Sequence, residues 1–522
     1  MNLTKEQLEI INSKHNNIKI NAVAGSGKTS TIIEYARKRA YNNKILYLAF
    51  NRAVKLEAIK KFKDNKIPNV VVDTIHALAY KSLVYKNGYR VKENGYNIEE
   101  IVKLFKMDLT YNNYDKYIIA NYINKFFIYF CNSNKSSIDE INYLNIVSDN
   151  EAKNFVKKNL HYIQEKIQLF FNKMINNEIE VTHDFYLKQY QLLNPELKYD
   201  YIIFDEAQDA SEVILDIILK QKACKVIVGD TNQQIYSFRY AINALEKTNF
   251  KTYYLSKSFR FNDYIANLAI EILKLKKYIG KEINVEIKGC GNSKEFKTKA
   301  FIARTNLGLF IKAINYLNRN KFIIFIELLK KIFKFKKNLK DIYFEGNINS
   351  LIYTSDGISL YDIINLYNKN YKLIKNKIIR ELKSFRELYD YINKTENKEL
   401  LLMLEIVKKY KNKTLKLLKR LKNRVMDNYD RKNAKIIFST VHKSKGLEYD
   451  VVELADDFIT KIELEKLSKN ITNDDYENIK LNEEINLLYV AITRTKNLLY
   501  IPKILLPQNY HNLETNNYIK VI

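Results

Sequence analysis

Short apolar runs rich in β-forming residues recur in two zones of the chain, and polar positions bound each run. Runs that stay apolar at consecutive positions, instead of alternating, are typical of parallel strands that helices cover on both faces. The pattern therefore predicts two α/β domains. The expected strands are Ile18–Val23, Ile45–Phe50, Val70–Val72, Tyr201–Phe204 and Val226–Val228 in the first zone, and Phe301–Ala303, Ile436–Phe438, Val451–Leu454 and Leu498–Ile501 in the second.

Stretches with helical spacing of apolar residues interrupt each zone, as in Ile118–Phe130, Phe155–Ile175, Ile311–Leu317 and Leu400–Leu421. The whole chain has four prolines, which favours long helices. We therefore expect two α/β domains that each contain a mostly helical insertion. The expected ranges are 1–82 and 196–250 for the first α/β domain, 83–195 for its insertion, 251–306 and 433–522 for the second α/β domain, and 307–432 for its lysine-rich insertion.

The charge of the chain points to an anionic partner. Lys and Arg number 87 against 59 Asp and Glu, which gives a formal net charge of +28. A nucleic-acid backbone is the usual partner of so basic a protein. Abundant Lys, Asn, Ile, Tyr and Phe with no Trp would also follow from A/T-biased codons. The charge thus supports nucleic-acid binding without establishing it.

Cysteine usage and hydropathy indicate the compartment. The three cysteines, Cys131, Cys224 and Cys290, lie far apart and form no CxxC pair, so neither a zinc nor an iron–sulfur site is predicted. The N-terminus lacks the apolar run of a signal peptide, and no apolar stretch is long enough to span a bilayer. We expect a soluble intracellular protein with no membrane partner, and a nucleus, a nucleoid or a viral replication site would each suit it.

The segment from Ile20 to Thr29, INAVAGSGKT, predicts a strand, a glycine-bearing turn and a helix from about Ser30. This is the arrangement of a P-loop, in which backbone N–H groups at a helix N-terminus bind phosphates. Lys28 would reach the β- and γ-phosphates of ATP, and Thr29 would hold Mg²⁺. The residues expected to bind the nucleotide are Ala24, Gly25, Ser26, Gly27, Lys28, Thr29 and Ser30.

A second segment, Tyr201 to Asp209, is an apolar strand that ends in two adjacent carboxylates. Such a strand delivers its carboxylates to the edge of the sheet, near the metal of the P-loop. We expect Asp205 to coordinate Mg²⁺, usually through water, and Glu206 to orient and deprotonate the attacking water. A solvated surface turn is the alternative, but the P-loop in the same chain argues against it.

Further segments occur in a fixed order, namely AVAGSGKTS, VVVDTIHALAY, FDEAQD, VGDTNQQIYSFRYA, LSKSFRF, STVHKSKGLEYD and LLYVAITRTKN. In this order they resemble the superfamily 1 helicases of the UvrD/Rep/PcrA type. LYLAFNRA, QQIYSFRYA and GLEYDVVELADDF look most similar to the F-box DNA helicase branch. The resemblance implies an α/β fold of two RecA-like P-loop motor domains. Because the motor motifs begin near the N-terminus, we expect no F-box.

The resemblance also implies roles at the nucleotide. Gln7 is similar to the glutamine that contacts the adenine edge, Phe259 to the aromatic that stacks on adenine, and Glu448 to the residue that contacts the ribose. Gln233 resembles the sensor of the γ-phosphate. Arg260 and Arg494 resemble two arginine fingers, which stabilise charge on the phosphates only when the cleft between domains closes. Taken alone, each arginine would be an ordinary salt-bridge partner.

A second group of matching positions has no role at the nucleotide. The resemblance implies that they contact single-stranded DNA, with Phe238 stacking between bases, an interaction that tolerates any sequence. Taken singly, the aromatic and histidine residues among them would more often be core residues. These positions are Thr74, His76, Tyr236, Phe238, Arg239, Thr440 and His442.

The leading hypothesis is an ATP-dependent helicase or translocase that moves 3′ to 5′ on single-stranded DNA in replication, repair or recombination. Its partners would be single-stranded DNA, junctions with duplex DNA, and replication or recombination proteins. RNA stays open as a substrate, since phosphate and stacking contacts distinguish the sugars poorly. Two alternatives are a translocase that strips proteins from DNA with little unwinding (an anti-recombinase), and a non-catalytic basic nucleic-acid-binding protein.

Overall fold

The computed structural model of the protein describes residues 3–107, 114–319, 340–346, 348–469, 475–507 and 517–522. Parts of both expected insertions and of the second α/β domain therefore lie outside the described residues. Two six-stranded sheets, both wholly parallel, organise what is described. We call them the first and the second sheet.

The first sheet has the order β3-β2-β4-β5-β1-β6. Its inner strands are buried on both faces: Ile45 and Tyr47 of β2 belong to the core under helices α1–α3, and Leu46 and Leu48 belong to the core on the other face. The strands are β1 (Ile18–Ala22), β2 (Ile45–Leu48), β3 (Val70–Asp73), β4 (Tyr201–Phe204), β5 (Cys224–Gly229) and β6 (Lys251–Leu255). The main helices beside them are α1 (Lys5–Ile11), α2 (Lys28–Ala40), α3 (Arg52–Asp64) and α10 (Glu212–Leu219).

The second sheet has the order β10-β11-β9-β12-β13-β14. Helices α12 and α22 cover one of its faces, and α13 covers the other. The strands are β9 (Lys299–Ala303), β10 (Ile342–Phe344), β11 (Ile436–Thr440), β12 (Tyr449–Leu454), β13 (Thr495–Ile501) and β14 (Ile519–Val521). The helices are α12 (Asp263–Leu273), α13 (Asn306–Arg319) and α22 (Asp475–Ile492).

The structure corrects the expected borders of the α/β domains in two places. Lys251–Leu255, which the sequence assigned to the second α/β domain, is strand β6 and pairs with β1 in the first sheet. Ile342–Phe344 lies inside the stretch expected to be a helical insertion, yet it is strand β10 and pairs with β11. Both are strands at a sheet edge. Edge strands are half exposed or short, so they lack the long apolar run that marks a central strand.

The described residues between β3 and β4 are mostly helical, and so are those between β9 and β11. Leu400–Leu421, expected as one helical run, is two helices because the chain turns at Lys411, whose φ is +47°. The helices of the first stretch include α6 (Ile98–Leu104), α7 (Asp115–Asn132), α8 (Asn150–Ile175) and α9 (His183–Leu192). Those of the second include α15 (Leu360–Tyr367), α16 (Lys377–Glu381), α17 (Phe385–Thr395), α18 (Lys398–Tyr410) and α19 (Lys413–Lys422).

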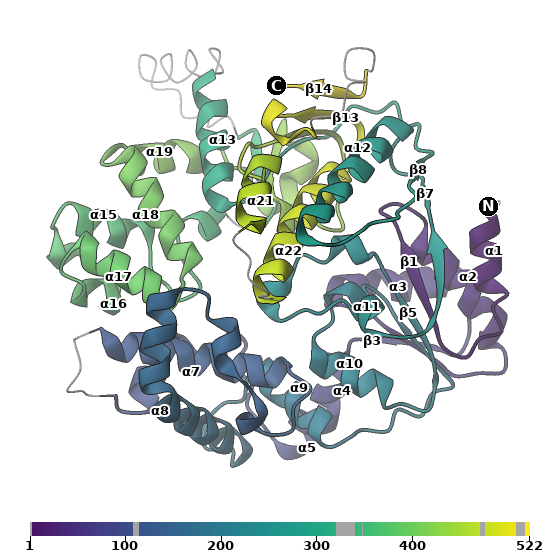
Figure 1. The fold of residues 1–522 in the computed structure, drawn as a ribbon, viewed down its shortest axis with the longest axis horizontal. Coiled ribbons are helices and arrows are strands. Elements are labelled where there is room, and N and C mark those ends of the chain that lie inside the picture. The colour runs from purple at the N-terminus through teal and green to yellow at the C-terminus, as the bar shows by residue number, and fades with distance from the viewer. Residues whose placement is uncertain (1–2, 108–113, 320–339, 347, 470–474, 508–516) are drawn as a thin grey trace.

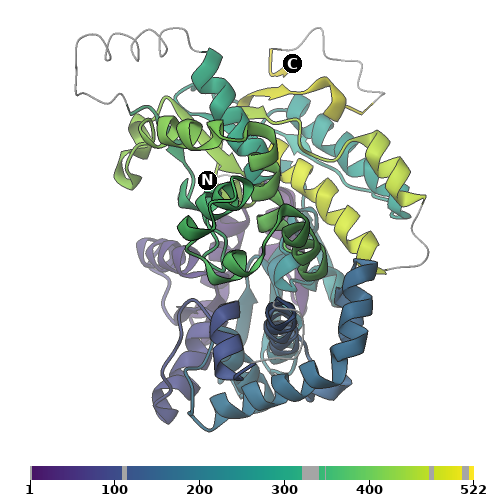
Figure 2. The same ribbon diagram turned by 90° about the vertical axis from the view of Figure 1, so that its left-hand side faces the viewer.

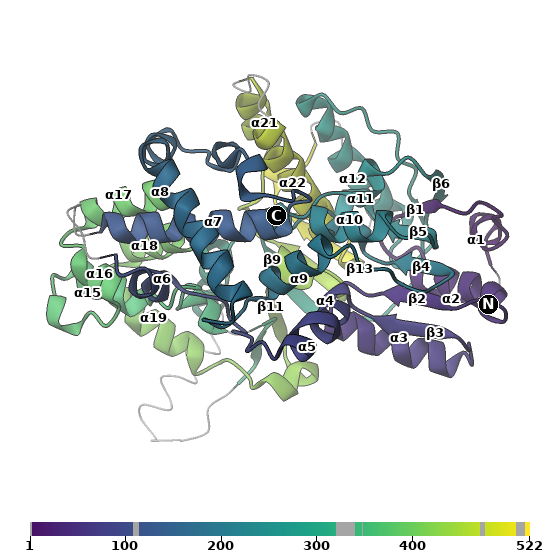
Figure 3. The same cartoon turned by 90° about the horizontal axis from the view of Figure 1, so that it is seen from below.

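The two helical stretches lie side by side, at the end of the molecule away from the N-terminus (Figures 1 and 3). Polar contacts join them, including hydrogen bonds from the Tyr117 hydroxyl to Glu381 at 2.7 Å and from Lys125 to Glu396 at 2.7 Å. Figure 2 shows α22, in yellow, extending from the second sheet toward the blue helices of the first stretch. Among the described residues, no helix is long and apolar enough to cross a membrane.

Candidate active site and strand groove

The loop after β1 has the backbone geometry of a phosphate-binding turn. Gly25 and Gly27 have φ values of +75° and +78°, which residues with a Cβ adopt at a cost. A Cβ at Gly25 would lie 2.6 Å from the Cβ of Arg260, so the loop packs closely on the segment after β6. Helix α2 begins at Lys28, two residues earlier than expected, and no side chain caps it. Its first N–H groups are therefore available to an anion.

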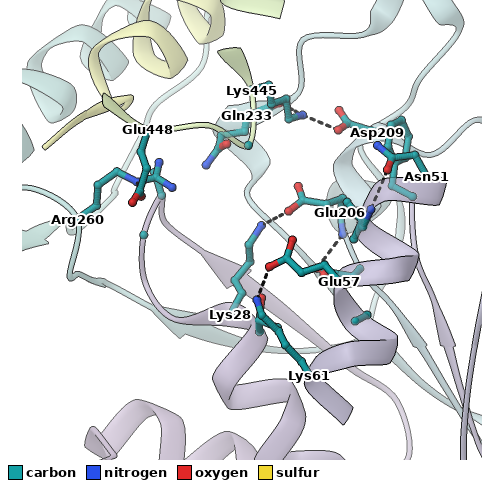
Figure 4. Close-up of a pocket in the computed structure, with 18 of the residues that line it drawn as sticks. Lys28, Asn51, Glu57, Lys61, Glu206, Asp209, Gln233, Arg260, Lys445 and Glu448 are labelled. Carbon is teal, nitrogen blue, oxygen red and sulfur yellow. Dashed lines mark hydrogen bonds and ion pairs between the residues drawn. The ribbon is translucent and has the colours of Figure 1, made fainter. Parts of the chain in front are cut away.

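Lys28 faces Glu206, the second of the two carboxylates that follow β4 (Figure 4). Its Nζ lies 2.7 Å from Oε1 of Glu206. Tyr47, on β2, donates its hydroxyl to Oδ2 of Asp205 at 2.5 Å. Glu206 has a left-handed backbone with φ +54°, a conformation that residues other than glycine rarely adopt. Such strain is found where a side chain must be aimed at a site, and here it turns the Glu206 carboxylate toward Lys28.

Burial and mutual charge set the protonation of this group. Burial alone would raise the pKa of Glu206, but the Lys28 ammonium and then Lys445 lower it to about 2. Burial and the neighbouring Glu206 charge raise the pKa of Asp205. Burial would lower the pKa of Lys28, yet the two carboxylates raise it above its usual value. Glu206 is thus an anion and Lys28 a cation throughout the neutral range.

The second α/β domain contributes two arginines to the same place. The Nε of Arg260 lies 3.0 Å from Oε2 of Glu448, and its Nη1 donates to the Thr493 carbonyl at 3.0 Å. Arg494 follows the end of α22 and is 1% exposed. Its Nη2 donates to Oε1 of Gln233, from the first sheet, at 3.3 Å. Burial and then the Arg260 charge lower the pKa of Arg494 to about 9, so it remains a cation at neutral pH.

These side chains line one cavity of about 570 Å³, which we call the cleft. The cleft brings together residues that lie as far apart in the chain as Ala24 and Arg494. Ser26 is buried beside it with an unpartnered hydroxyl, and Ser30, which was expected to bind the nucleotide, is not among its lining residues. The expected residues that do line it are Ala24, Gly25, Lys28, Thr29, Asp205, Glu206, Gln233, Arg260, Glu448 and Arg494.

Gln7 and Phe259 flank the P-loop from the outside. The Gln7 amide nitrogen donates to Oγ1 of Thr31 at 3.2 Å, and its Oε1 accepts the backbone N–H of Thr4 at 2.9 Å. A Cβ built at Gly27 would lie 3.2 Å from that amide nitrogen and 3.9 Å from the Phe259 ring. Phe259 is 52% exposed, so its ring is open to a planar partner. The two side chains therefore stand where a base beyond the phosphates would lie.

A bond that the sequence does not indicate joins the two domains across the cleft. Lys445, from the segment between β11 and β12, donates to Oδ2 of Asp209 at 2.5 Å and to the Gln233 carbonyl at 2.6 Å. Burial raises the pKa of Asp209 to about 6 although Lys445 opposes this. Asp209 lies in the segment FDEAQD and Lys445 in the segment STVHKSKGLEYD, but no pattern in the sequence indicates that the two side chains meet.

A second cavity, of about 960 Å³, opens beside the cleft, and we call it the strand groove. Tyr236 lines both cavities. Phe238 is 60% exposed, and its ring meets that of His442 edge to face at 5.5 Å. Burial and then the Arg304 charge lower the pKa of His442 to about 4, so its ring is neutral at pH 7. The expected residues that line the strand groove are Tyr236, Phe238, Arg239, Thr440 and His442.

Thr74 and His76 do not lie in the strand groove. The Thr74 hydroxyl caps a short helix, α4 (Ile75–Ala79), by accepting from Ala77 N at 3.1 Å. The ring of His76 packs edge to face against Tyr186 at 6.3 Å. Their position at the end of edge strand β3 explains this separation. Their expected contact with DNA stays a prediction, and the geometry of the groove gives it no support.

Known proteins share these features. A family described as the UvrD/REP helicase N-terminal domain matches residues 3–252. Over these residues the chain is similar to the UvrD/REP helicases. Its two parallel sheets are accordingly two RecA-like motor domains, and the resemblance expected from the sequence is confirmed.

Three relatives illustrate the similarity. F-box DNA helicase 1 of Gallus gallus is 31% identical over 95% of the chain and 48% of its own length. F-box DNA helicase protein 1 of Schizosaccharomyces pombe is 29% identical over 96% of the chain and 57% of its own length. A probable DNA helicase II homolog of Mycoplasma genitalium is 23% identical over 96% of the chain. The chain thus spans about half the length of the two F-box relatives.

Proposed function

We propose that the chain is an ATP-driven motor that moves along single-stranded DNA and separates strands. One observation carries the proposal: a single cavity is lined by Lys28 and Glu206 from the first α/β domain and by Arg260 and Arg494 from the second. Charges that meet only across two domains make hydrolysis depend on how the domains are placed. The names of the relatives, all DNA helicases, support DNA as the substrate.

The residues of the cleft suit a nucleoside triphosphate. The N-terminus of α2 and Lys28 would hold its phosphates, and exposed Phe259 with Gln7 would hold its base. Glu206 is an anion that could accept a proton from the attacking water. Lys28 forms an ion pair with Glu206. Lys28 must leave this carboxylate and bind phosphate before Glu206 can accept the proton.

The cleft also suits Mg²⁺. Within the described ranges, no three His, Cys, Asp or Glu residues gather to hold a metal ion by themselves. Mg²⁺ commonly takes only one or two protein ligands and completes its shell with water and phosphate oxygens. Asp205 and Thr29, both on the cleft wall, would supply those ligands. Mg²⁺, when bound, would neutralise charge on the phosphates during their transfer.

The strand groove suits a single strand. Phe238 offers an exposed face for a base, and Arg239 and Thr440 offer donors to phosphates. Insertion residues Tyr353 and Lys398 also line the strand groove, so a strand there would touch both motor domains and the second helical stretch. We propose motor domains over about residues 1–82 with 196–255 and about 256–306 with 433–522, and helical insertions between them, the second of which also supplies β10.

ATP hydrolysis with and without single-stranded DNA tests the proposal. Lys28→Ala should abolish hydrolysis, because it removes the cation that holds the phosphates. Lys38→Ala is the matched control, since Lys38 lies on the same helix and makes an exposed bond to Asn12. We expect DNA to stimulate the wild type and Lys38→Ala alike. Equal slow hydrolysis by the wild type and Lys28→Ala, with or without DNA, contradicts the proposal.

Unwinding and direction need a second assay. Strand separation is measured on duplexes that carry a single-stranded 3′ tail, a 5′ tail or no tail. The similarity to UvrD/REP proteins predicts separation of the duplex with the 3′ tail, which corresponds to movement from 3′ to 5′. An RNA strand of the same sequence tests the choice of sugar. Hydrolysis stimulated by DNA without strand separation on any duplex would restrict the function to translocation.

A further inference from the structure

Helix α22 connects the two cavities. It runs from Asp475 to Ile492 on the second sheet, and from Glu483 to its last residue it is about 14 Å long, at a rise of about 1.5 Å per residue. Along that length it packs against two short turns of the first sheet's domain, Thr231–Gln233 and Ser237–Arg239. One turn belongs to the cleft and the other to the strand groove.

The groove end of α22 holds the segment that carries Phe238. Glu483 accepts the backbone N–H of Ser237 through Oε1 at 3.3 Å, and its Oε2 accepts the Ser237 hydroxyl. The next residue, Glu484, accepts the Arg304 guanidinium at 2.7 Å. Ser237 directly precedes Phe238, so Glu483 fixes the backbone from which the exposed ring projects.

The middle and the C-terminal end of α22 form hydrogen bonds with the segment that precedes Ser237 in the chain. Asn486, three residues after Glu483, donates to the Gln234 carbonyl at 2.9 Å. Tyr489, three residues further, donates to the carboxylate of Asp230 at 3.2 Å. Residues at this spacing lie on one face of a helix. The series ends at Arg494 and its contact with Gln233 in the cleft.

We propose that α22 is the rod that couples the cleft to the strand groove, and that Glu483 is the positioning residue at its groove end. The inference rests on the proposed function. Arg494 and Gln233 meet where the γ-phosphate would lie, so a nucleotide that draws Arg494 toward it displaces α22 along its whole length. Because two hydrogen bonds join Glu483 to Ser237, that displacement moves Phe238 and changes how its ring stacks on a base.

Glu483 touches neither cavity, which separates it from the reacting groups. Glu483→Ala removes both bonds to Ser237. Glu483→Gln keeps an oxygen that accepts the Ser237 N–H, and its amide nitrogen can donate to the Ser237 hydroxyl. Ser237→Ala removes that hydroxyl. Glu477→Ala is the matched control, since Glu477 is exposed on the first turns of the same helix. Far-ultraviolet circular dichroism and the melting temperature establish that each variant is folded.

The expected result is a loss of coupling with intact hydrolysis. Hydrolysis without DNA should match the wild type in Glu483→Ala, while its stimulation by single-stranded DNA should fall by about fivefold or more, the scale of a typical coupling between sites. Glu483→Gln should restore stimulation, and Glu477→Ala should behave as the wild type. A destabilised fold would lower the rate of hydrolysis both without and with DNA. Loss of stimulation alone therefore identifies Glu483 as a positioning residue.

A 2-aminopurine oligonucleotide gives a second readout at the groove. In the wild type, a non-hydrolysable ATP analogue should change the fluorescence of the bound base, because Phe238 shifts. In Glu483→Ala and Ser237→Ala the change should be at least halved. If Glu483→Ala does not fold, the fluorescence change in Ser237→Ala alone tests the proposal, with the same expectation that it is at least halved.

Two outcomes have different meanings. A wild type whose hydrolysis ignores DNA refutes the proposed function. A wild type that DNA stimulates, together with Glu483→Ala and Ser237→Ala variants that respond to DNA and to the analogue as it does, leaves the proposed function intact and overturns the role of α22.

Discussion

Replacing Arg494 by lysine tests the interdomain cleft most directly. The guanidinium donates to the carbonyls of Val490 at 3.0 Å and Leu447 at 3.3 Å, and to Gln233 at 3.3 Å. A lysine keeps one positive charge but has a single nitrogen, so it cannot reproduce these bonds and also face a phosphate. Removing an arginine finger typically costs a factor of about 10³–10⁵ in rate, or about 4–7 kcal/mol.

The burial of Arg494 adds a pH dependence. Its surroundings lower the arginine pKa from 12.5 to about 9. The same burial would lower the pKa of a lysine at this position below its usual value, which is already lower than that of arginine. The variant should therefore lose positive charge as the pH rises from 6 to 8, whereas the wild type keeps its charge. We expect Arg494→Lys to lose about 10³-fold or more at pH 8 and to recover part of that loss relative to the wild type at pH 6.

Steady-state hydrolysis with saturating single-stranded DNA, measured from pH 6 to pH 8, checks this. Arg431→Lys is the control, because Arg431 pairs with Glu345 in the same domain, away from the cleft. It should hydrolyse ATP like the wild type at every pH. Arg494→Lys within threefold of the wild type at pH 8, or a ratio that stays constant with pH, would refute the assigned position of the guanidinium.

Three further changes have defined outcomes. Tyr47→Phe removes the hydroxyl that holds Asp205, so half-maximal hydrolysis should need several-fold more Mg²⁺, and an unchanged Mg²⁺ titration contradicts this. Phe238→Ala should weaken single-stranded DNA binding by about 1–3 kcal/mol while Phe238→Trp restores it, as fluorescence anisotropy would measure. The pKa of Asp209 is raised to about 6, so its contribution to stability is present at acid pH and is lost as pH rises through 6. The urea midpoint of the wild type should therefore fall between pH 4 and 7 by an amount that is absent in Asp209→Asn. Midpoints of the two proteins that change equally with pH would argue against this.

Much of the fold could be predicted because central strands and helices are local patterns. The runs around Ile20, Ile203 and Ile437 are continuous and apolar, and each is a buried parallel strand. The edge strands β6, β10 and β14 escaped prediction. Their residues are half exposed or few, so no apolar period distinguishes them from a loop, and only their pairing with a neighbour makes them strands.

The sequence by itself determined the groups whose chemistry depends on neighbours in the chain. The P-loop around Lys28 and the carboxylates Asp205 and Glu206 each lie within a few residues of a strand end, so their geometry follows from one strand and one turn. Tertiary structure alone decided which distant groups meet: Arg494 at Gln233, and Lys445 at Asp209. The physical reason is that these contacts depend on how two separately folded sheets pack, and no local propensity encodes that packing.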